Sequence, residues 1–120
     1  MIAPSHSTVS SDCRFEVDEV FPTGLVTGRN GDVEIPVGAV FTSLRKSKFE
    51  GSVAELREMD LGVIAKVSLR LYKVEFFRQF IGAVPPGCSA GLHLSGEGMH
   101  LVRQALLERR ERECLTLHFE

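Results

Sequence analysis

Residues Arg14 to Arg29, RFEVDEVFPTGLVTGR, decide the fold class of this chain. Apolar and polar residues alternate along the first half of this stretch, and the alternation changes phase at Asp18-Glu19, which predicts a strand with a β-bulge. Pro22-Thr23-Gly24 supplies turn chemistry, and Leu25 to Arg29 resumes the strand pattern. The stretch therefore predicts the start of a meander of short strands.

Short strands and turns continue beyond this stretch. Asn30-Gly31 is typical of a tight turn, Pro36 marks a strand end or an edge because proline has no amide hydrogen, and Ala39 to Leu44 is an apolar run. We expect Ser52 to Met59 to be a strand, with a short helix as the alternative. Asp60-Leu61-Gly62 is expected to be a turn in either case.

The second half of the chain adds one long strand and one helix. Alternation from Val63 to Phe77 predicts a long half-exposed strand, or two strands in sequence, and Ala90 to Leu94 predicts another. From Met99 to Glu111 or so the spacing becomes helical, and Leu115 to Phe119 alternates again. We therefore predict a mainly β fold, a small closed β-barrel with one C-terminal helix and a closing strand.

Length and composition suit a single globular domain. The chain has 120 residues, of which 43% are hydrophobic and 25% charged. We expect a flexible N-terminal segment at 1–11 and a single β-barrel domain at 12–120. No stretch approaches the roughly 20 apolar residues of a membrane-spanning helix, and the first residues lack the pattern of a signal peptide. A cytoplasmic location without a membrane partner is the expectation.

The charge of the chain argues against strong autonomous RNA binding. Lysine and arginine number 14 against 16 aspartate and glutamate residues, a net charge of -2, whereas domains that bind nucleic acid through its phosphates are usually basic. The basic cluster Arg45, Lys46 and Lys48 is expected to be a solvated turn at the end of a strand. The mixed charges of Glu108 to Glu113 are expected to form a solvated helix end.

Cysteines and histidines form no catalytic or metal-binding pattern. Cys13, Cys88 and Cys114 are far apart and make no C-x-x-C pair, so we expect reduced, mostly buried thiols. An enzyme hypothesis rests only on unassigned carboxylates and on Cys88 and His93, whose odd separation would place them on opposite faces if they lie on one strand. No cofactor or catalytic residue is expected. No metal is expected either, because the histidines lack the spacing of metal ligands: His6, His93, His100 and His118.

Three sequence blocks together resemble the second domain of translational GTPases such as elongation factor Tu. They are the opening stretch quoted above, Val74 to Arg78 (VEFFR) and Gly87 to Gly96 (GCSAGLHLSG), and they occur in the family's order. The resemblance implies a small β-barrel of the translation-factor domain 2 type, with an extra hairpin around Ser52 to Val63. The sequence contains no G-x-x-x-x-G-K-[ST] phosphate loop, so the resemblance does not include the GTPase domain and no nucleotide is expected.

The resemblance also implies a site. In that family, the glutamate and arginine that match Glu75 and Arg78 lie beside the terminal adenosine of aminoacyl-tRNA. The implied partner-binding residues are Arg29, Glu75, Phe77 and Arg78; a carboxylate accepts hydrogen bonds from ribose hydroxyls, and a guanidinium stacks on bases or pairs with phosphate.

Two alternatives for these residues stay open. Glu75 and Arg78 could form an ion pair with each other while Arg29 closes a turn. The neighbouring phenylalanines could be a stacking platform, but aromatic residues beside aliphatic strands more often belong to the core: Phe76, Phe77 and Phe80.

These features favour a noncatalytic binding module that engages a protein or RNA component of translation. The alternative is an immunity- or antitoxin-like protein that binds and blocks a toxin, which the slightly acidic composition suits. A small enzyme is the least favoured hypothesis.

Overall fold

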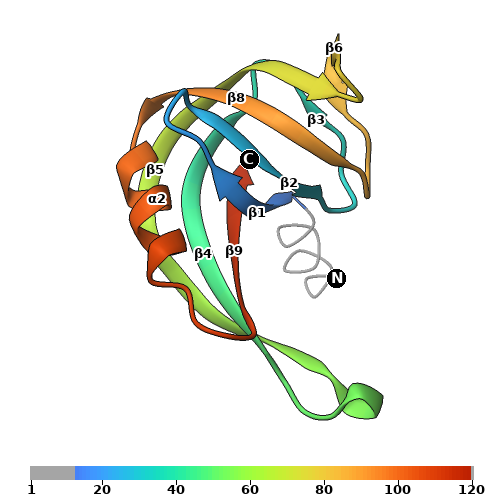
Figure 1. The fold of residues 1–120 in the computed structure, drawn as a ribbon, viewed down its shortest axis with the longest axis vertical. Helices are drawn as coiled ribbons and strands as arrows, with labels where there is room; N and C mark the ends of the chain where they lie inside the picture. The colour runs from blue at the N-terminus through green and yellow to red at the C-terminus, as the bar shows by residue number, and fades with distance from the viewer. Residues whose placement is uncertain (1–12, 120) are drawn as a thin grey trace, which may run out of the picture.

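A computed structural model describes residues 13–119, in which six antiparallel strands close into a barrel (Figure 1). The strands follow each other around the ring in the order β4-β9-β1-β2-β8-β5, and β5 pairs back with β4. β6 pairs with β5 outside the ring, and β3 pairs with β7 in a separate two-stranded sheet. The strands are β1 (Arg14–Val20), β2 (Leu25–Asn30), β3 (Ile35–Pro36), β4 (Val40–Glu50), β5 (Arg57–Phe76), β6 (Gln79–Ile81), β7 (Ala83–Val84), β8 (Ser89–Glu97) and β9 (Glu113–Phe119).

The predicted mainly β fold, a closed barrel with one helix, is confirmed. Along a strand, every second side chain points into the core, as Val67, Leu69 and Leu71 of β5 show. The bulge expected in β1 is present, because the pairing of β1 with β2 shifts between Val17 and Glu19. The flexible segment expected at 1–11 lies outside the described residues.

Gly28, the glycine of the T-G-R block, is required where β2 passes β1. A Cβ at this position would collide with the carbonyl oxygen of Glu16 and would lie 2.6 Å from the ring of Phe15. Phe15 is fully buried in the core. The glycine thus allows β1 and β2 to approach closely over a large core side chain.

Asn30 does not form the tight turn that Asn-Gly predicts. The side chain ends β2 and is buried, with 4% of its surface exposed. Its Nδ2 donates to the carbonyl oxygens of Val33, Val84 and Pro85, at 2.9, 3.2 and 3.1 Å. Because two of these partners lie more than fifty residues away in sequence, Asn30 ties the β3–β7 sheet to the barrel instead of reversing the chain.

The hairpin of β4 and β5 differs most from expectation. The basic cluster lies inside β4, not in a turn, because its residues pair with β5 on one side and β9 on the other. Each cation has a carboxylate partner: Arg45 with Asp60, Lys46 with Glu113 and Lys48 with Glu50. Ser52 to Met59 holds a short 3-10 turn, η1 (Val53–Glu55), before β5 begins.

Asp60-Leu61-Gly62 is also part of a strand and not a turn. β5 already runs through these residues, and its pairing with β4 is irregular there. Gly62 has a φ of 90°, and its amide donates to Oδ1 of Asp60 at 2.7 Å. The turn chemistry read from the sequence is therefore used for a bulge within a long strand.

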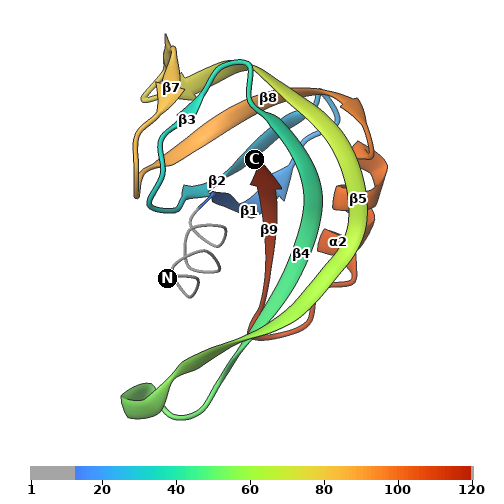
Figure 2. The same cartoon turned by 180° about the vertical axis from the view of Figure 1, so that it is seen from behind.

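Part of this hairpin leaves the barrel. We call residues 49–58 the arm, because residues 59–64 pair with β4 where β4 also pairs with β9. Figures 1 and 2 show the arm extending from one end of the molecule, while Figure 1 shows β6 at the opposite end. The arm overlaps the segment expected as an extra hairpin.

The helix α2 (Met99–Leu107) packs on the barrel with Val102 and Ala105 buried. It ends at Leu107, before the expected Glu111, and the chain then tightens into a turn in which the amide of Arg109 donates to the carbonyl oxygen of Leu106 at 3.3 Å. The mixed charges of 108–112 thus form a turn leading into β9, not a helix end. Among residues 13–119, no helix is long and apolar enough to cross a membrane.

Candidate binding surface

The turn between β5 and β6 holds two of the four predicted site residues in an unusual conformation. Phe76 pairs with Gln79, which leaves Phe77 and Arg78 as a two-residue turn. Their φ angles are 50° and 65°. Positive φ at both central positions is the signature of a type I′ turn, which normally uses asparagine and glycine. A phenylalanine in this region is a conformational outlier, and outliers of this kind concentrate at functional sites.

Aromatic side chains gather at this turn and face solvent. Phe77 is 85% exposed, Phe80 62% and Tyr72 49%. The expectation that such phenylalanines belong to the core is wrong for Phe77 and Phe80, because the β5–β6 hairpin lies outside the closed ring and, among residues 13–119, nothing buries the two rings. The ring of Phe76 meets that of Phe77 edge-on, with 4.5 Å between centroids.

Glu75 pairs with His93, a residue that sequence reasoning did not place in the site. Glu75 lies opposite Gly91 in the β5–β8 register, and Lys73 lies opposite His93. Oε1 of Glu75 is 3.2 Å from Nε2 of His93. The missing side chain at Gly91 leaves room for this contact, which only the register reveals. Within residues 13–119, the alternative ion pair between Glu75 and Arg78 is not formed.

Aromatic and cationic groups surround His93. The rings of Tyr72 and Phe80 lie 6.0 and 6.2 Å from the imidazole, and Nζ of Lys73 lies 4.4 Å from the centroid of the Phe80 ring. The last contact is a cation–π interaction that holds the lysine over the aromatic face. We call this set the turn surface: Tyr72, Lys73, Glu75, Phe77, Arg78, Phe80 and His93.

An open groove runs beside the turn surface. Glu75 and Phe77 line it, with Phe76 and residues from the facing strands. Its lining is mostly apolar, so a flat or apolar group fits it better than a highly charged one. The lining residues are Asp18, Thr27, Gly28, Glu75, Phe76, Phe77, Cys88, Ser89 and Ala90.

Arg29 lies apart from the other predicted site residues, on β2, with β8 between it and β5. Its Nε donates to the carbonyl oxygen of Gly87 at 3.3 Å, so it fixes the loop before β8. It lines a separate recess together with Arg14, Glu16 and Asp32. The structure thus brings Glu75, Phe77 and Arg78 together and leaves Arg29 at the far side of the β8 strand.

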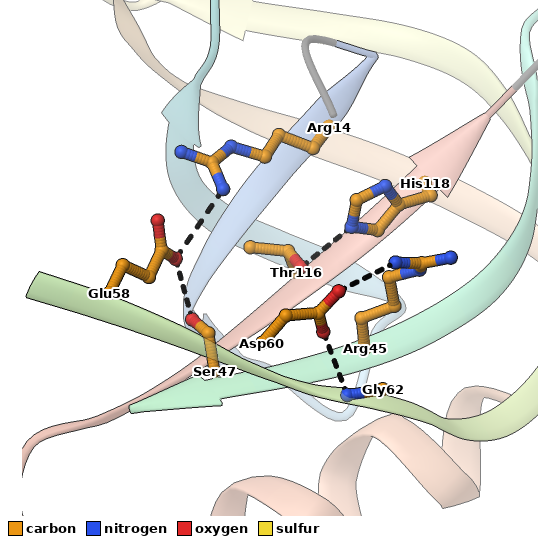
Figure 3. A network of polar contacts seen from close by, with 8 residues as sticks. All are labelled: Arg14, Arg45, Ser47, Glu58, Asp60, Gly62, Thr116 and His118. Atoms are coloured by element: carbon orange, nitrogen blue, oxygen red, sulfur yellow. Dashed lines mark hydrogen bonds and ion pairs between the residues drawn. The ribbon is translucent and has the colours of Figure 1, made fainter. Parts of the chain in front are cut away.

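A second polar cluster lies at the base of the arm (Figure 3). Glu58 accepts hydrogen bonds from Ser47 Oγ at 2.6 Å and from Arg14 Nη1 at 3.4 Å, and Arg45 Nη1 lies 3.1 Å from Asp60 Oδ2. Each guanidinium therefore has a carboxylate partner, so the cluster offers no excess positive charge to an anionic ligand. We interpret it as the fixation of the arm against β1 and β4.

The three cysteines are reduced, as expected. Cys13, Cys88 and Cys114 are free thiols of intermediate exposure, so the expectation of mostly buried side chains is wrong. Desolvation, together with the charge of Glu16, raises the pKa of the Cys114 thiol to about 11. Within residues 13–119, no cluster of three or more histidine, cysteine, aspartate or glutamate residues is arranged to hold a metal ion, and His6 lies outside that range.

Comparison of the chain with protein-family models, with curated proteins and with solved structures finds no match. The fold is a small closed antiparallel barrel, which is compatible with a barrel domain of the kind that the sequence blocks resemble.

Proposed function

We propose that this chain is a noncatalytic binding module that resembles the second domain of translational GTPases and contacts a protein or RNA component of translation through its turn surface. The observation that carries the proposal is the pair Phe77 and Arg78, which are held in left-handed backbone conformations. Phe77 exposes 85% of its surface.

Energetic reasons support a binding role for this pair. A non-glycine residue in the left-handed region costs roughly 1–2 kcal/mol, and an exposed aromatic ring gains nothing from the core. Aromatic and arginine side chains dominate the binding energy of interfaces. Because the two-residue turn fixes the backbone of both residues, little backbone entropy is lost when a partner binds.

The side chains of the turn surface can contact either a protein or an RNA. Phe77 and Arg78 offer planar faces for a base or for an apolar protein side chain, and Glu75 offers a hydrogen-bond acceptor. The net charge of -2 argues that affinity does not come from general attraction to phosphate. Stacking and shape would then provide the specificity.

Affinity capture from a native cell extract, with and without RNase, tests the proposal. Wild type is compared with Phe77→Ala, Arg78→Ala and the control Arg110→Ala, since Arg110 is an exposed arginine outside the turn surface whose backbone amide bond to Glu113 survives substitution. We expect both turn variants to lose at least tenfold in recovery of the same protein or RNA species, while the control retains it. Equal recovery by all four proteins would refute the site.

A toxin-blocking, immunity-like protein is the second candidate. It is favoured by the exposed aliphatic side chains of the arm, since such groups suit a protein interface better than RNA. In the same experiment, one RNase-resistant protein would support this candidate, whereas tRNA or ribosomal material lost on RNase treatment would support the translation module.

A further inference from the structure

The groove beside the turn surface follows one row of residues across four strands. Thr27 of β2 lies opposite Gly91 of β8, which in turn lies opposite Glu75 of β5. On its other side, Thr27 lies opposite Glu19 of β1, and Asp18 is the extra residue of the bulge beside it. The neighbours of this row along β2, β8 and β5 are fully buried: Val26, Leu92 and Val74. The row therefore faces outward, and the groove runs over the outside of the barrel from β1 to β5.

The two ends of the groove differ from its middle. Over β2 and β8 it is lined by small side chains, among them Thr27, Ser89 and Ala90. At the β5 end it is bounded by the rings of Phe76 and Phe77. A side chain that enters beside Phe77 can therefore extend along the small residues toward β1.

The charged groups of the groove have one sign. Among the described residues that line it, Asp18 and Glu75 are the charged ones, and none is a lysine or an arginine. Within residues 13–119 the carboxylate of Asp18 has no hydrogen bond or ion pair. Glu75 uses Oε1 for its contact with His93. The groove thus presents a free carboxylate at its β1 end and a second carboxylate at its β5 end.

The cations nearby are engaged elsewhere or lie outside the groove. Nζ of Lys73 lies over the ring of Phe80, 4.4 Å from its centroid. Arg29 donates to the carbonyl oxygen of Gly87 and lines the separate recess. Arg78 belongs to the neighbouring turn and is not among the residues that line the groove. The charge of Asp18 is therefore left for a cation of another molecule.

A guanidinium matches these groups better than other charged groups do. It is flat, carries a single delocalised charge, pairs with a carboxylate through two parallel hydrogen bonds and stacks on aromatic rings. An ammonium is more strongly hydrated, so it loses more on entering a largely apolar groove. A phosphate would meet two negative charges there.

We propose that the groove receives an arginine side chain of a protein partner, which lays its aliphatic stem beside Phe77 and pairs its guanidinium with Asp18. This inference rests on the proposed function, because the groove adjoins the turn surface. It narrows the partner from a protein or an RNA to a protein with an exposed arginine.

Titration of the isotope-labelled protein with N-acetyl-arginine amide, followed by NMR, tests the proposal. We expect saturable shifts of the backbone amides of Thr27, Phe77 and Ala90. N-acetyl-citrulline amide, which has the same shape without the charge, should bind about fivefold more weakly. Asp18→Asn should weaken binding of the arginine amide to a similar extent. Asp32→Asn is the matched control and should bind like wild type, because Asp32 is an exposed carboxylate that lines the other recess.

Several outcomes would overturn the proposal. They are no saturable shift of these amides, equal binding of the two amino-acid amides, or unchanged binding by Asp18→Asn. Shifts caused by adenosine monophosphate in place of the arginine amide would assign the groove to RNA. In the affinity capture, loss of the partner by Phe77→Ala but not by Asp18→Asn would leave the proposed function intact and refute the arginine site alone.

Discussion

At the scale of single residues, some roles can be predicted from the local sequence and others depend on contacts that only the fold creates. The position of Gly28 follows from the T-G-R block, but its reason is the packing of β2 over Glu16 and Phe15. The role of Asn30 could not be predicted, because two of its three carbonyl partners come from β7 and the loop after it. His93 was missed as a partner of Glu75 for the same reason, since strand register is a property of the whole sheet.

Substitution of Gly28 tests the close approach of β1 and β2. Gly28→Ala should destabilise the protein by about 3 kcal/mol or more, because the new Cβ collides with the backbone of Glu16 and forces the strands apart. Gly82→Ala is the control, since no atom lies within 4 Å of a Cβ at that position. Urea unfolding measures both variants, and a Gly28→Ala midpoint equal to that of the control would contradict the packing argument.

Cys114 predicts a dependence of stability on alkaline pH. The folded state raises the pKa of this thiol from 9.0 to about 11, first through desolvation and then through Glu16. The unfolded chain therefore releases the proton at lower pH than the folded chain, so stability is lost as pH rises from about 9 through about 11. The denaturant midpoints of wild type and Cys114→Ser are compared at increasing pH. In this window the midpoint of wild type should fall relative to that of Cys114→Ser. A constant difference would exclude the effect.

At the scale of elements, the local sequence predicted most strands well, but it did not predict where the strands of the long β4–β5 hairpin end and begin. Asp60-Leu61-Gly62 has the composition of a turn, but Arg45 pairs with Asp60 and keeps the segment in β5. Charged residues in β4 looked like a loop for the same reason, because the carboxylate partners of Arg45 and Lys46 are distant in sequence. The β5–β6 turn carries no glycine or asparagine, so no local signal marked it.

A stability–binding trade-off is expected at the β5–β6 turn. Replacing Phe77 with asparagine and Arg78 with glycine installs the residues that a type I′ turn favours. The double variant should be more stable than wild type by about 1–2 kcal/mol, because both left-handed positions are relieved, and should lose partner binding. Arg78→Gly alone should give part of the stabilisation and keep the Phe77 ring. Thermal melting measures the stability, and a destabilised double variant would show that the turn is not strained.

At the scale of the whole molecule, the barrel places the two candidate surfaces at opposite ends (Figure 1). The closed ring follows from alternation and turn spacing, and this part of the fold was predictable because each strand buries one face. The site residues came from the resemblance to translation-factor domains. Their surroundings depend on sheet register, and the groove beside Phe77 is lined by residues from four separate strands, β1, β2, β5 and β8, and from the loop before β8.

The central claim is that Phe77 and Arg78 contact a partner, and photo-crosslinking tests it most directly. A photoreactive phenylalanine analogue is placed at position 77 and, as a control, at position 110, and each protein is irradiated in a native cell extract. The account predicts one dominant protein or RNA adduct at position 77 that is absent at position 110. No adduct at position 77, or the same adducts at both positions, would contradict it.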